Sequence, residues 1–391
     1  MDLSRIRAGI NLRSLDVGSG SSVETLTQRR GFDLNKSESG IGEYQRYIQA
    51  FNIERWLKPL DGVTFPTVMS DISPAEAREL AGCYESFKSG VESIQPSHTL
   101  IESLQRSVEE VDHGCGVFIK TSSRSAKDFA NHERLQAEFG TRLANLPNPT
   151  GHEGTCENDQ MIAMSYASME LLRMRSASEA LEFFAKSERT WNDMVLALAC
   201  EENGWEEHAI VRRWVDLEPD MEFRCFVANG CLTAISQYHH LVYFPRLVSN
   251  RDSVLLRLLA AFHEISPRLE GITPRNGYVL DIAVELRSGE ASLPGITSRE
   301  PMSADAFVAV WAVEVNPFFD TADGCLCSWT KNLSLLITPV AEGTPPDFRI
   351  RTAPARGSSS LLYKDWKEAI RTAAEQPQRG AAAFKNMAPY S

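Results

Sequence analysis

Several common nucleotide-binding and catalytic motifs are missing from this 391-residue chain. It has no GxxxxGK(S/T) phosphate loop and no GxGxxG segment after a strand, which excludes a P-loop site and a Rossmann dinucleotide site. The HRD and DFG elements of protein kinases and the GxSxG nucleophile elbow of serine hydrolases are absent too. If this protein binds phosphates, side chains must therefore do most of the binding.

Long apolar runs are also lacking. The longest candidate, residues 255–262, is interrupted by Arg257 and falls well short of the ~18 apolar residues of a membrane-spanning helix. No hydrophobic secretory core follows the N-terminus. We therefore expect a cytosolic protein that is not associated with a membrane.

Positive charge is in deficit, because the formal net charge is -12 at pH 7. This balance argues against direct binding of nucleic acid over a broad surface and favours basic proteins as partners. Hydrophobic residues make up 43% and charged residues 24%, as in ordinary globular proteins. A chain of this length usually exceeds one core, so two lobes with a site in the cleft between them are expected.

The eight cysteines form no CxxC pair, which suits reduced thiols better than a disulfide framework or a zinc site. Cys325 and Cys327 are the closest pair, and no histidine lies near them in the sequence. Their CxC spacing therefore predicts ordinary, partly buried thiols rather than metal ligands.

The pattern along the chain predicts an α+β protein with a helical first half and a strand-rich second half. We expect a flexible lead-in (1–40), a mostly helical lobe (41–205), a lobe with an antiparallel sheet (206–340), and a final helix and tail (341–391). Apolar periodicity and cap residues predict helices over 42–57, after Ser73, from Ser97, after Ser125, and over 159–173, 177–200, 253–265 and 361–374. Alternating or apolar runs predict strands over 116–121, 210–215, 222–227, 232–237, 277–286 and 307–316.

Two local signals refine this pattern. Asn229-Gly230 predicts a two-residue hairpin, and the three strands 210–215, 222–227 and 232–237 are expected in one antiparallel sheet. The segment 287–305, rich in glycine, serine and proline, is expected to be a mobile loop.

The most informative segment is 307–320, in which an apolar strand ends in Glu-Val-Asn-Pro. Alternation directs Glu314 and Asn316 to one face of the strand, where both offer oxygen ligands. Asp281 follows an apolar stretch on a strand that we expect to pair with this one. Two carboxylates facing one site repel unless a cation intervenes, so we infer magnesium completed by substrate phosphates.

Basic side chains on other strands could contact those phosphates. Lys120 could direct its ammonium at a phosphate, although a lysine at a strand end is more often a solvated surface residue. Arg224 shares a face with Glu222, and an ion pair between them would hold the Arg224 guanidinium in a fixed position for bidentate phosphate binding. The alternative is that Arg224 only forms a structural ion pair across the sheet. Trp214 could be a core residue or an adenine wall. His239 and His240 point in opposite directions on a strand, which disfavours a shared metal.

Taken in chain order, four segments resemble the cell division cycle protein 123 family. They are FIKTSSRSAKD, VRRWVDLEPDMEFRCFVANGCLTAISQ, YVLDIAVEL and VEVNPF. The second is the most specific, because it reproduces the family's Met-Glu-Phe-Arg-Cys-Phe-Val, hairpin and Ile-Ser-Gln pattern. The resemblance extends from Gly116 to Trp329.

The resemblance implies an ATP-grasp-like fold with Mg-ATP between two α/β lobes. It further implies an assembly chaperone for eukaryotic translation initiation factor 2 that binds the gamma subunit of that factor. Carried onto this sequence, the site residues are phosphate contacts, an adenine-binding strand and magnesium ligands. They are Lys120 and Arg224 for phosphate, Arg212, Arg213, Trp214 and Val215 with the adjoining Val211 for adenine, and Asp281, Glu314 and Asn316 for Mg²⁺.

This chain departs from the family pattern at two places. Glu-Val-Asn-Pro replaces the family's Asp-Phe-Asn-Pro, so Glu314 reaches the metal with a longer side chain. Tyr238, His239 and His240 replace an Arg-Asp pair after Gln237. A diverged member with another client is therefore an open alternative. A second is an ATP-grasp ligase or phosphotransferase acting on an unidentified small molecule or protein, and a third is a scaffold with an inactive nucleotide site.

Overall fold

The computed structural model describes residues 46–91, 96–128, 132–146, 157–199, 201–274, 277–287, 293–320, 322–341, 343–362 and 371. The lead-in predicted over 1–40 and the predicted C-terminal tail lie outside the described residues, as does most of the helix predicted over 361–374. Everything below refers to the described part of the chain.

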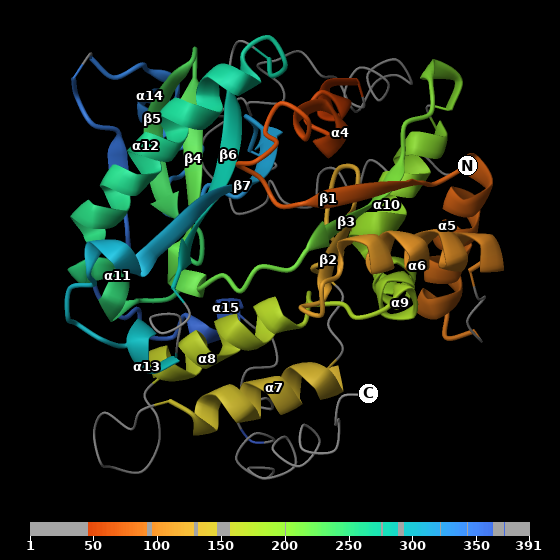
Figure 1. Ribbon diagram of the computed structural model, residues 1–391, viewed down its shortest axis with the longest axis horizontal. Coiled ribbons are helices and arrows are strands. Elements are labelled where there is room, and N and C mark those ends of the chain that lie inside the picture. The colour runs from red at the N-terminus through yellow and green to blue at the C-terminus, as the bar shows by residue number, and fades with distance from the viewer. Residues whose placement is uncertain are drawn as a thin grey trace, which may run out of the picture.

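Two separate β-sheets organise the molecule, with helices packed around them (Figure 1). The smaller sheet is antiparallel, and its strands in spatial order are β1 (Thr67–Asp71), β3 (His208–Arg213) and β2 (Val117–Thr121). The larger sheet contains, in spatial order, β7 (Phe307–Pro317), β6 (Tyr278–Leu286), β4 (Glu222–Ala228), β5 (Cys231–Gln237) and β8 (Asp347–Arg349). Only the β5–β8 pair is parallel among these described strands. The predicted α+β class is confirmed.

Most of the described helices lie beside one sheet or the other (Figure 1). Those near the three-stranded sheet are α5 (Pro74–Lys88), α6 (His98–Val111), α9 (Ala177–Lys186) and α10 (Glu188–Ala199). Those near the five-stranded sheet are α11 (Pro245–Ser249), α12 (Arg251–Leu269), α13 (Leu293–Ile296), α14 (Leu333–Ile337) and α15 (Ser359–Leu362). The remaining helices are α4 (Ile53–Trp56), α7 (His132–Ala144) and α8 (Glu157–Glu170), and the short 3₁₀ turns are η1 (Glu201–Asn203), η2 (Pro219–Met221) and η3 (Ala304–Ala306).

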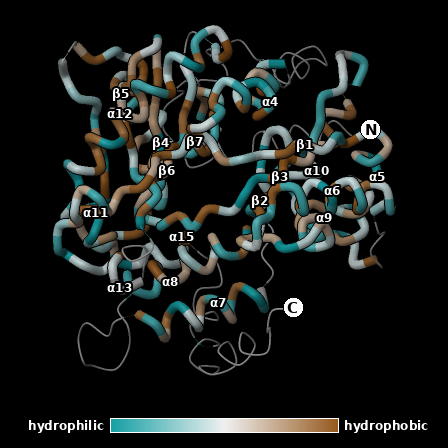
Figure 2. The backbone as a smooth tube through the Cα atoms, viewed as in Figure 1, coloured by the Kyte–Doolittle hydropathy of each residue, from teal (hydrophilic) through white to brown (hydrophobic). Residues whose placement is uncertain are grey.

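Apolar residues follow this division (Figure 2). One buried cluster joins β4, β6, α8 and α12, and a second joins the three-stranded sheet to α5, α6 and α9. Strand β3 contributes to both clusters, because Ile210 belongs to the first whereas Ala209 and Val211 belong to the second. Alternate side chains of a strand point to opposite faces, so β3 has one core on each side. Ile210 and Arg212 therefore face the five-stranded sheet.

Local sequence signals predicted several elements correctly. Ser73 caps α5 in a complete capping box with Glu76, and Ser97 is the residue before α6. Asn229 and Gly230 both have positive φ, 51° and 78°, as a tight turn between β4 and β5 requires. The predicted pairing of 277–286 with 307–316 is confirmed as β6 with β7.

Other predictions for the helices were wrong. The helix predicted over 177–200 is two helices, because Ser187 is extended and its hydroxyl accepts from the N–H of Thr190 at 3.1 Å, which starts α10. Ser125 does not cap a helix, since the next described helix, α7, begins only at His132. The stretch predicted as one helix over 42–57 breaks at residues 50–52, before α4.

The strand assignment also needs correction. Strand β3 was predicted to share a sheet with β4 and β5. It lies instead between β1 and β2 in the smaller sheet. The chain passes from one sheet to the other over residues 214–218. The segment 287–305, predicted to be a mobile loop, contains the described turns α13 and η3, and residues 288–292 lie outside the described residues.

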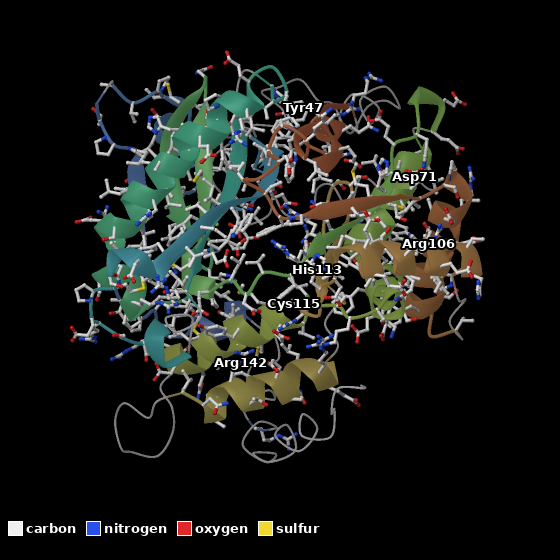
Figure 3. All side chains as sticks on the ribbon, in the orientation of Figure 1. Tyr47, Asp71, Arg106, His113, Cys115 and Arg142 are labelled. Carbon is white, nitrogen blue, oxygen red and sulfur yellow. The ribbon has the colours of Figure 1, made fainter. Side chains whose placement is uncertain are left out.

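Figure 3 labels side chains from several of these elements. Asp71, at the end of β1, and Arg106, on α6, lie on the side of the three-stranded sheet, whereas Arg142 lies on α7. None of the helices described in the structure has both the length and the apolar character needed to cross a bilayer.

Candidate functional site

A group of charged and polar side chains lies where the two sheets meet, and we call it the inter-sheet cluster. Its members come from β2, β4, β6 and β7, and are Lys120, Arg224, Asp281, Glu314 and Asn316. All five were predicted as site residues from the sequence. The structure therefore brings together side chains that are separated by up to about half of the chain.

The register of the strands explains the meeting of these residues. Lys120 lies directly opposite Ile210, so both point from the three-stranded sheet toward the larger one. In the larger sheet Arg224 lies opposite Asp281, and Asp281 lies opposite Glu314. Directly paired residues share a face, which puts these three charged side chains in one row across three strands.

A β-bulge in β7 lies next to this row. Asp281 pairs with Glu314 but Ile282 pairs with Ala312, so Val313 is an extra residue with no partner on β6. The carbonyl of Val313 instead accepts a hydrogen bond from Nη1 of Arg212 at 2.6 Å. The bulge therefore gives β3 an attachment point on β7.

Lys120 and Glu314 form an ion pair between the two sheets, with Nζ 2.5 Å from Oε1. The side chain of Lys120 is only 4% exposed and that of Glu314 is 22% exposed. Burial alone would raise the pKa of Glu314, but the charges of Lys120 and Lys127 reverse this and lower it to about 2. The solvated-surface interpretation of Lys120 is therefore wrong.

Arg224 and Asp281 form a second buried pair. Nε and Nη2 of Arg224 donate to Oδ1 and Oδ2 of Asp281, each at 2.8 Å, in a bidentate arrangement. Burial alone would lower the pKa of Arg224, but the Asp281 carboxylate more than offsets this and raises it. Arg224 also lies 5.0 Å from the centre of the Tyr238 ring, at cation–π distance. Pairing with Glu222, which the sequence predicted, is not what fixes Arg224.

Asn316 links the two carboxylates. Its Nδ2 lies 3.1 Å from Oδ2 of Asp281 and 3.3 Å from Oε2 of Glu314. A rotation of the amide would present Oδ1 to the same position, beside two carboxylates. A carboxylate has about four acceptor positions, of which Asp281 uses three and Glu314 two in these bonds, so both keep capacity to bind a cation. This donor set fits Mg²⁺, which prefers oxygen ligands.

Sequence reasoning missed the neighbours of the cluster. Lys127 donates to the hydroxyl of Tyr238 at 3.1 Å, and His239 faces Glu222 with Nε2 3.5 Å from Oε2. His239 and His240 have different surroundings, but they lie after β5, which ends at Gln237, and not on a strand as the prediction assumed. The involvement of Lys127 and Tyr238 could not be predicted, because the two residues are 111 positions apart and neither belongs to a periodic pattern.

The residues assigned to adenine binding lie at and after the end of β3. The side chain of Arg212 is buried and donates to Thr64 and to Val313, both at 2.6 Å, so it holds the two sheets together. The N–H groups of Arg213 and Trp214 donate to Pro66 and Gly116 at 2.9 and 3.1 Å. Val215 lies on the segment that connects the two sheets. These residues are adjacent in the chain, but no described contact joins Arg213, Trp214 or Val215 to the inter-sheet cluster.

An antiparallel sheet and a mixed sheet, joined by a buried ionic cluster, define the class of this molecule, an α+β protein with its polar site between the sheets. The D123 family model matches residues 167–374, so the chain belongs to the D123 family. The matched region contains four members of the inter-sheet cluster and begins after Lys120. The resemblance found in the sequence is thereby confirmed.

Individual relatives agree with this assignment. The cell division cycle protein 123 of Phaeosphaeria nodorum is 30% identical over 158 residues, covering 40% of this chain and 35% of the relative. The translation initiation factor eIF2 assembly protein of Danio rerio is 25% identical over 190 residues, covering 46% of this chain and 48% of the relative. The corresponding protein of Aspergillus fumigatus is 29% identical over 128 residues, covering 33% of this chain and 25% of the relative. The aligned region thus spans less than half of each of these relatives.

The fold also has a solved counterpart. The structure of Cdc123 from Schizosaccharomyces pombe superposes with a TM-score of 0.50 and covers 78% of this chain and 97% of that chain, at 17% sequence identity. This similarity supports a shared fold and carries no information on ligands.

Proposed function

We propose that this protein is a cytoplasmic, Mg-ATP-binding assembly factor for eukaryotic translation initiation factor 2 that acts by binding the gamma subunit. Relatives named translation initiation factor eIF2 assembly protein support the client. The observation that carries the nucleotide site is the inter-sheet cluster, in which Lys120 on one sheet contacts Glu314 on the other at 2.5 Å. A ligand bound there would contact both halves of the molecule at once.

The charges of the cluster suit a metal-bound triphosphate. Lys120 and Arg224 now neutralise Glu314 and Asp281. If the two carboxylates bound Mg²⁺, the side chains of Lys120 and Arg224 could bind phosphate oxygens instead. Every buried charge would then keep a partner of opposite charge. Because both basic groups are held by bonds in the protein, little side-chain entropy would be lost when they bind phosphate.

The metal would be held by Asp281, Glu314 and Asn316, whose oxygens are its preferred ligand type. A metal held by these residues would neutralise part of the charge of the carboxylates and of the phosphates. Arg224 would remain oriented by Tyr238, with the ring centre 5.0 Å away, while its guanidinium exchanged one partner for another. Arg224 thus supplies a planar, bidentate group suited to phosphate.

The base of the nucleotide would lie along residues 213–215, in the segment that connects the sheets. The N–H groups of Arg213 and Trp214 are used within the fold, so an adenine edge would meet the N–H of Val215 and the carbonyl groups of the segment. For Arg212, whose side chain holds Thr64 and Val313, any nucleotide contact would come from the main chain.

Calorimetric titration with Mg-ATP tests the nucleotide site. We expect Lys120→Met and Asp281→Asn each to weaken binding by at least about tenfold, because each removes a contact worth more than ~1.4 kcal/mol. The exposed Lys58, changed to Ala, is the matched control and should bind normally. Unchanged Mg-ATP affinity in both cluster variants, with folding verified by circular dichroism, would contradict the proposal.

The client is tested separately, with the intact chain and purified gamma subunit of the initiation factor. We expect capture of the gamma subunit that increases with Mg-ATP in the wild type but not in Lys120→Met. Normal ATP affinity without capture of the gamma subunit would retain the nucleotide site and reject the client.

A further inference from the structure

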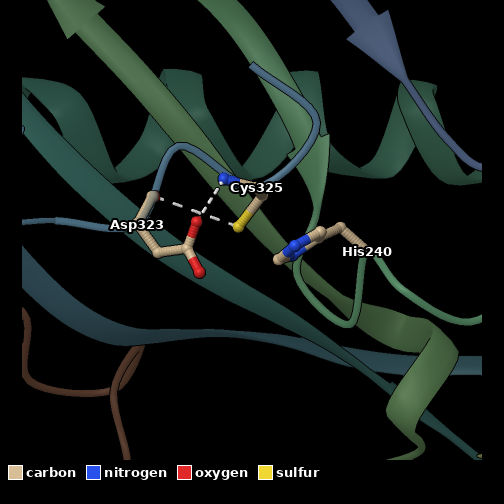
Figure 4. Close-up of side chains that lie close together, drawn as sticks. All are labelled: His240, Asp323 and Cys325. Carbon is tan, nitrogen blue, oxygen red and sulfur yellow. Dashed lines mark hydrogen bonds between the residues drawn. The ribbon is translucent and has the colours of Figure 1, made fainter. Parts of the chain in front are cut away.

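A second group of side chains lies beside the inter-sheet cluster and supplies none of the proposed ligands of the ATP site. It consists of His240, after β5, and of Asp323 and Cys325, in the loop after β7. One ligand atom from each residue lies within 4.8 Å of the other two. Figure 4 shows the three side chains directed at a common space, with the sulfur of Cys325 between the imidazole and the carboxylate.

We propose that His240, Asp323 and Cys325 form a binding site for a zinc-type transition-metal ion. Imidazole nitrogen, thiolate sulfur and carboxylate oxygen are the three ligand types that Zn²⁺ takes in proteins. The mixed set excludes Mg²⁺ and Ca²⁺, which take oxygen ligands. Zinc–ligand bonds are about 2.0–2.3 Å long, so tetrahedral ligand atoms lie roughly 3.3–3.8 Å apart, and small side-chain rotations would close this set on an ion.

The histidine is oriented for this role by main-chain contacts. Its Nδ1 lies 3.3 Å from the carbonyl oxygen of Tyr238, which can only accept, so Nδ1 carries the hydrogen and Nε2 keeps its lone pair. A carbonyl that fixes the tautomer of a ligand histidine is the usual outer contact of zinc sites. The carbonyl of His240 in turn accepts from Nε of Arg351 at 2.7 Å, which holds the turn in place.

The loop that carries the other two ligands is tightly built. Cys325 has φ of 54°, a left-handed conformation uncommon for residues with a side chain. A Cβ on Gly324 would lie 1.9 Å from the carbonyl oxygen of Cys327, so only glycine fits there. The N–H of Leu326 donates to the hydroxyl of Ser236 on β5 at 2.9 Å. The loop is thus tied to the strand that leads to His240.

The carboxylate of Asp323 has room for a metal. Its Oδ1 accepts from the N–H of Cys325 at 2.8 Å, and Figure 4 shows the other carboxylate oxygen pointing away from that N–H. Asp323 is exposed whereas His240 and Cys325 are partly buried, so an ion would reach the site from the side of the carboxylate. Three protein ligands would leave a fourth position for water or another small ligand.

This site shares one contact with the ATP site but does not depend on it. The carbonyl of Asp323 accepts from Nη1 of Arg224 at 2.7 Å, the same guanidinium that binds Asp281. Zinc on this loop would therefore stabilise the position of Arg224. The ligand set is nevertheless complete without any nucleotide, so the two proposals can fail separately.

Titration of the full-length protein with Co²⁺ tests the site directly. The protein is purified under reducing conditions, stripped with a chelator and supplied with excess Mg²⁺. We expect a sulfur-to-cobalt charge-transfer band that saturates at one ion per chain and disappears when Zn²⁺ is added. Bound Co²⁺ without this band would overturn the proposal, because the thiolate would not be a ligand.

Substitutions identify the ligands. Cys325→Ser and His240→Gln should each lower Zn²⁺ affinity at least about 100-fold, because loss of even an outer contact costs 10–100-fold. Cys327→Ser is the matched control from the same CxC pair, since Cys327 packs in an apolar cluster with Phe226. Cys115→Ser, at an exposed cysteine, is a second control. Wild-type Zn²⁺ affinity in Cys325→Ser would overturn the site, and if that variant does not fold, His240→Gln and the cobalt band decide.

Discussion

Glu314 keeps its charge at a position where burial alone would favour the neutral acid. The nearby ammonium groups of Lys120 and Lys127 outweigh burial and lower the pKa from 4.5 to about 2. The charged form of Glu314 is therefore stabilised by its lysine partners. Removing either the carboxylate or Lys120 leaves the other charge buried and poorly solvated. Such a pair is stable until another ion of suitable charge replaces a partner, which is the property that a phosphate and metal site requires.

Lowering the pH should destabilise the folded protein by protonating Glu314 and so breaking its ion pair with Lys120. Because the pKa of Glu314 is lower in the folded than in the unfolded protein, the unfolded chain takes up the proton first as pH falls. The stabilisation is present above pH 4.5 and is lost between 4.5 and about 2. It amounts to about 3 kcal/mol. In urea unfolding across this range, Glu314→Gln should be less stable than wild type at neutral pH and lose less stability on acidification.

The exposed Glu110, changed to Gln, is the control for general acid effects and should follow wild type at every pH. If Glu314→Gln and wild type lost stability in parallel between these pH values, the carboxylate of Glu314 would not be charge-stabilised in the folded protein.

At the scale of helices and strands, local signals were predictive and non-local ones were not. The Ser73 capping box and the Asn229-Gly230 turn each depend on residues within four positions, so the sequence contains all the information. The break at Ser187 was missed because Asp128, 59 residues away, accepts from its hydroxyl and helps to hold it out of a helix. Helix propensity gives no indication of so distant a partner.

The same difference applies to the candidate site. Alternation along β7 correctly placed Glu314 and Asn316 on one face, because a strand has a fixed period. The partner of Arg224 was misassigned to Glu222 because cross-strand neighbours depend on register, which the sequence leaves open. The approach of His240 to Cys325 was missed for a related reason, since 85 positions separate them and a loop after β7 brings them together.

The turn η2, which leads into β4, rests on a buried ionic network. Arg246 donates to both oxygens of Asp220, at 2.8 and 2.6 Å, and to Glu218 at 2.7 Å. The side chain of Asp220 is fully buried. Arg246→Leu should therefore lower the free energy of unfolding by about 3–5 kcal/mol, because a buried carboxylate loses its counter-charge.

Chemical denaturation at neutral pH measures this loss. The control is Arg287→Gln, because Arg287 pairs with Asp305 at 2.8 Å but both side chains are more than half exposed. That change should cost less than about 1 kcal/mol. Equal stability of the two variants would mean that the network does not support η2.

At the scale of the whole molecule, three contacts among the described residues connect β7 to the three-stranded sheet or to the segment that precedes β1. One is the Lys120–Glu314 ion pair, a second is the bond from Arg212 to the Val313 carbonyl, and the third is a main-chain bridge in which Ala312 donates to Val63 at 2.8 Å. All three reach β7 within residues 312–314. A ligand at the inter-sheet cluster would therefore act on the point where the sheets are connected.

Hydrogen exchange with and without Mg-ATP tests this coupling. At a ligand concentration 100 times the Kd, binding adds about 2.7 kcal/mol to any opening that releases the ligand, which slows exchange through that opening about 100-fold. We expect slower exchange in β2 and β7 together, although they belong to different sheets. Lys120→Met should lose the effect in both strands, and Lys58→Ala should retain it.

The same samples separate an assembly factor from a ligase or phosphotransferase. If the output is binding, protection of both strands should persist for as long as ATP is present, and ADP should not accumulate. Protection confined to one sheet would contradict coupling through the inter-sheet cluster. ADP release that depended on an added acceptor molecule would instead identify an enzyme, because only turnover consumes ATP.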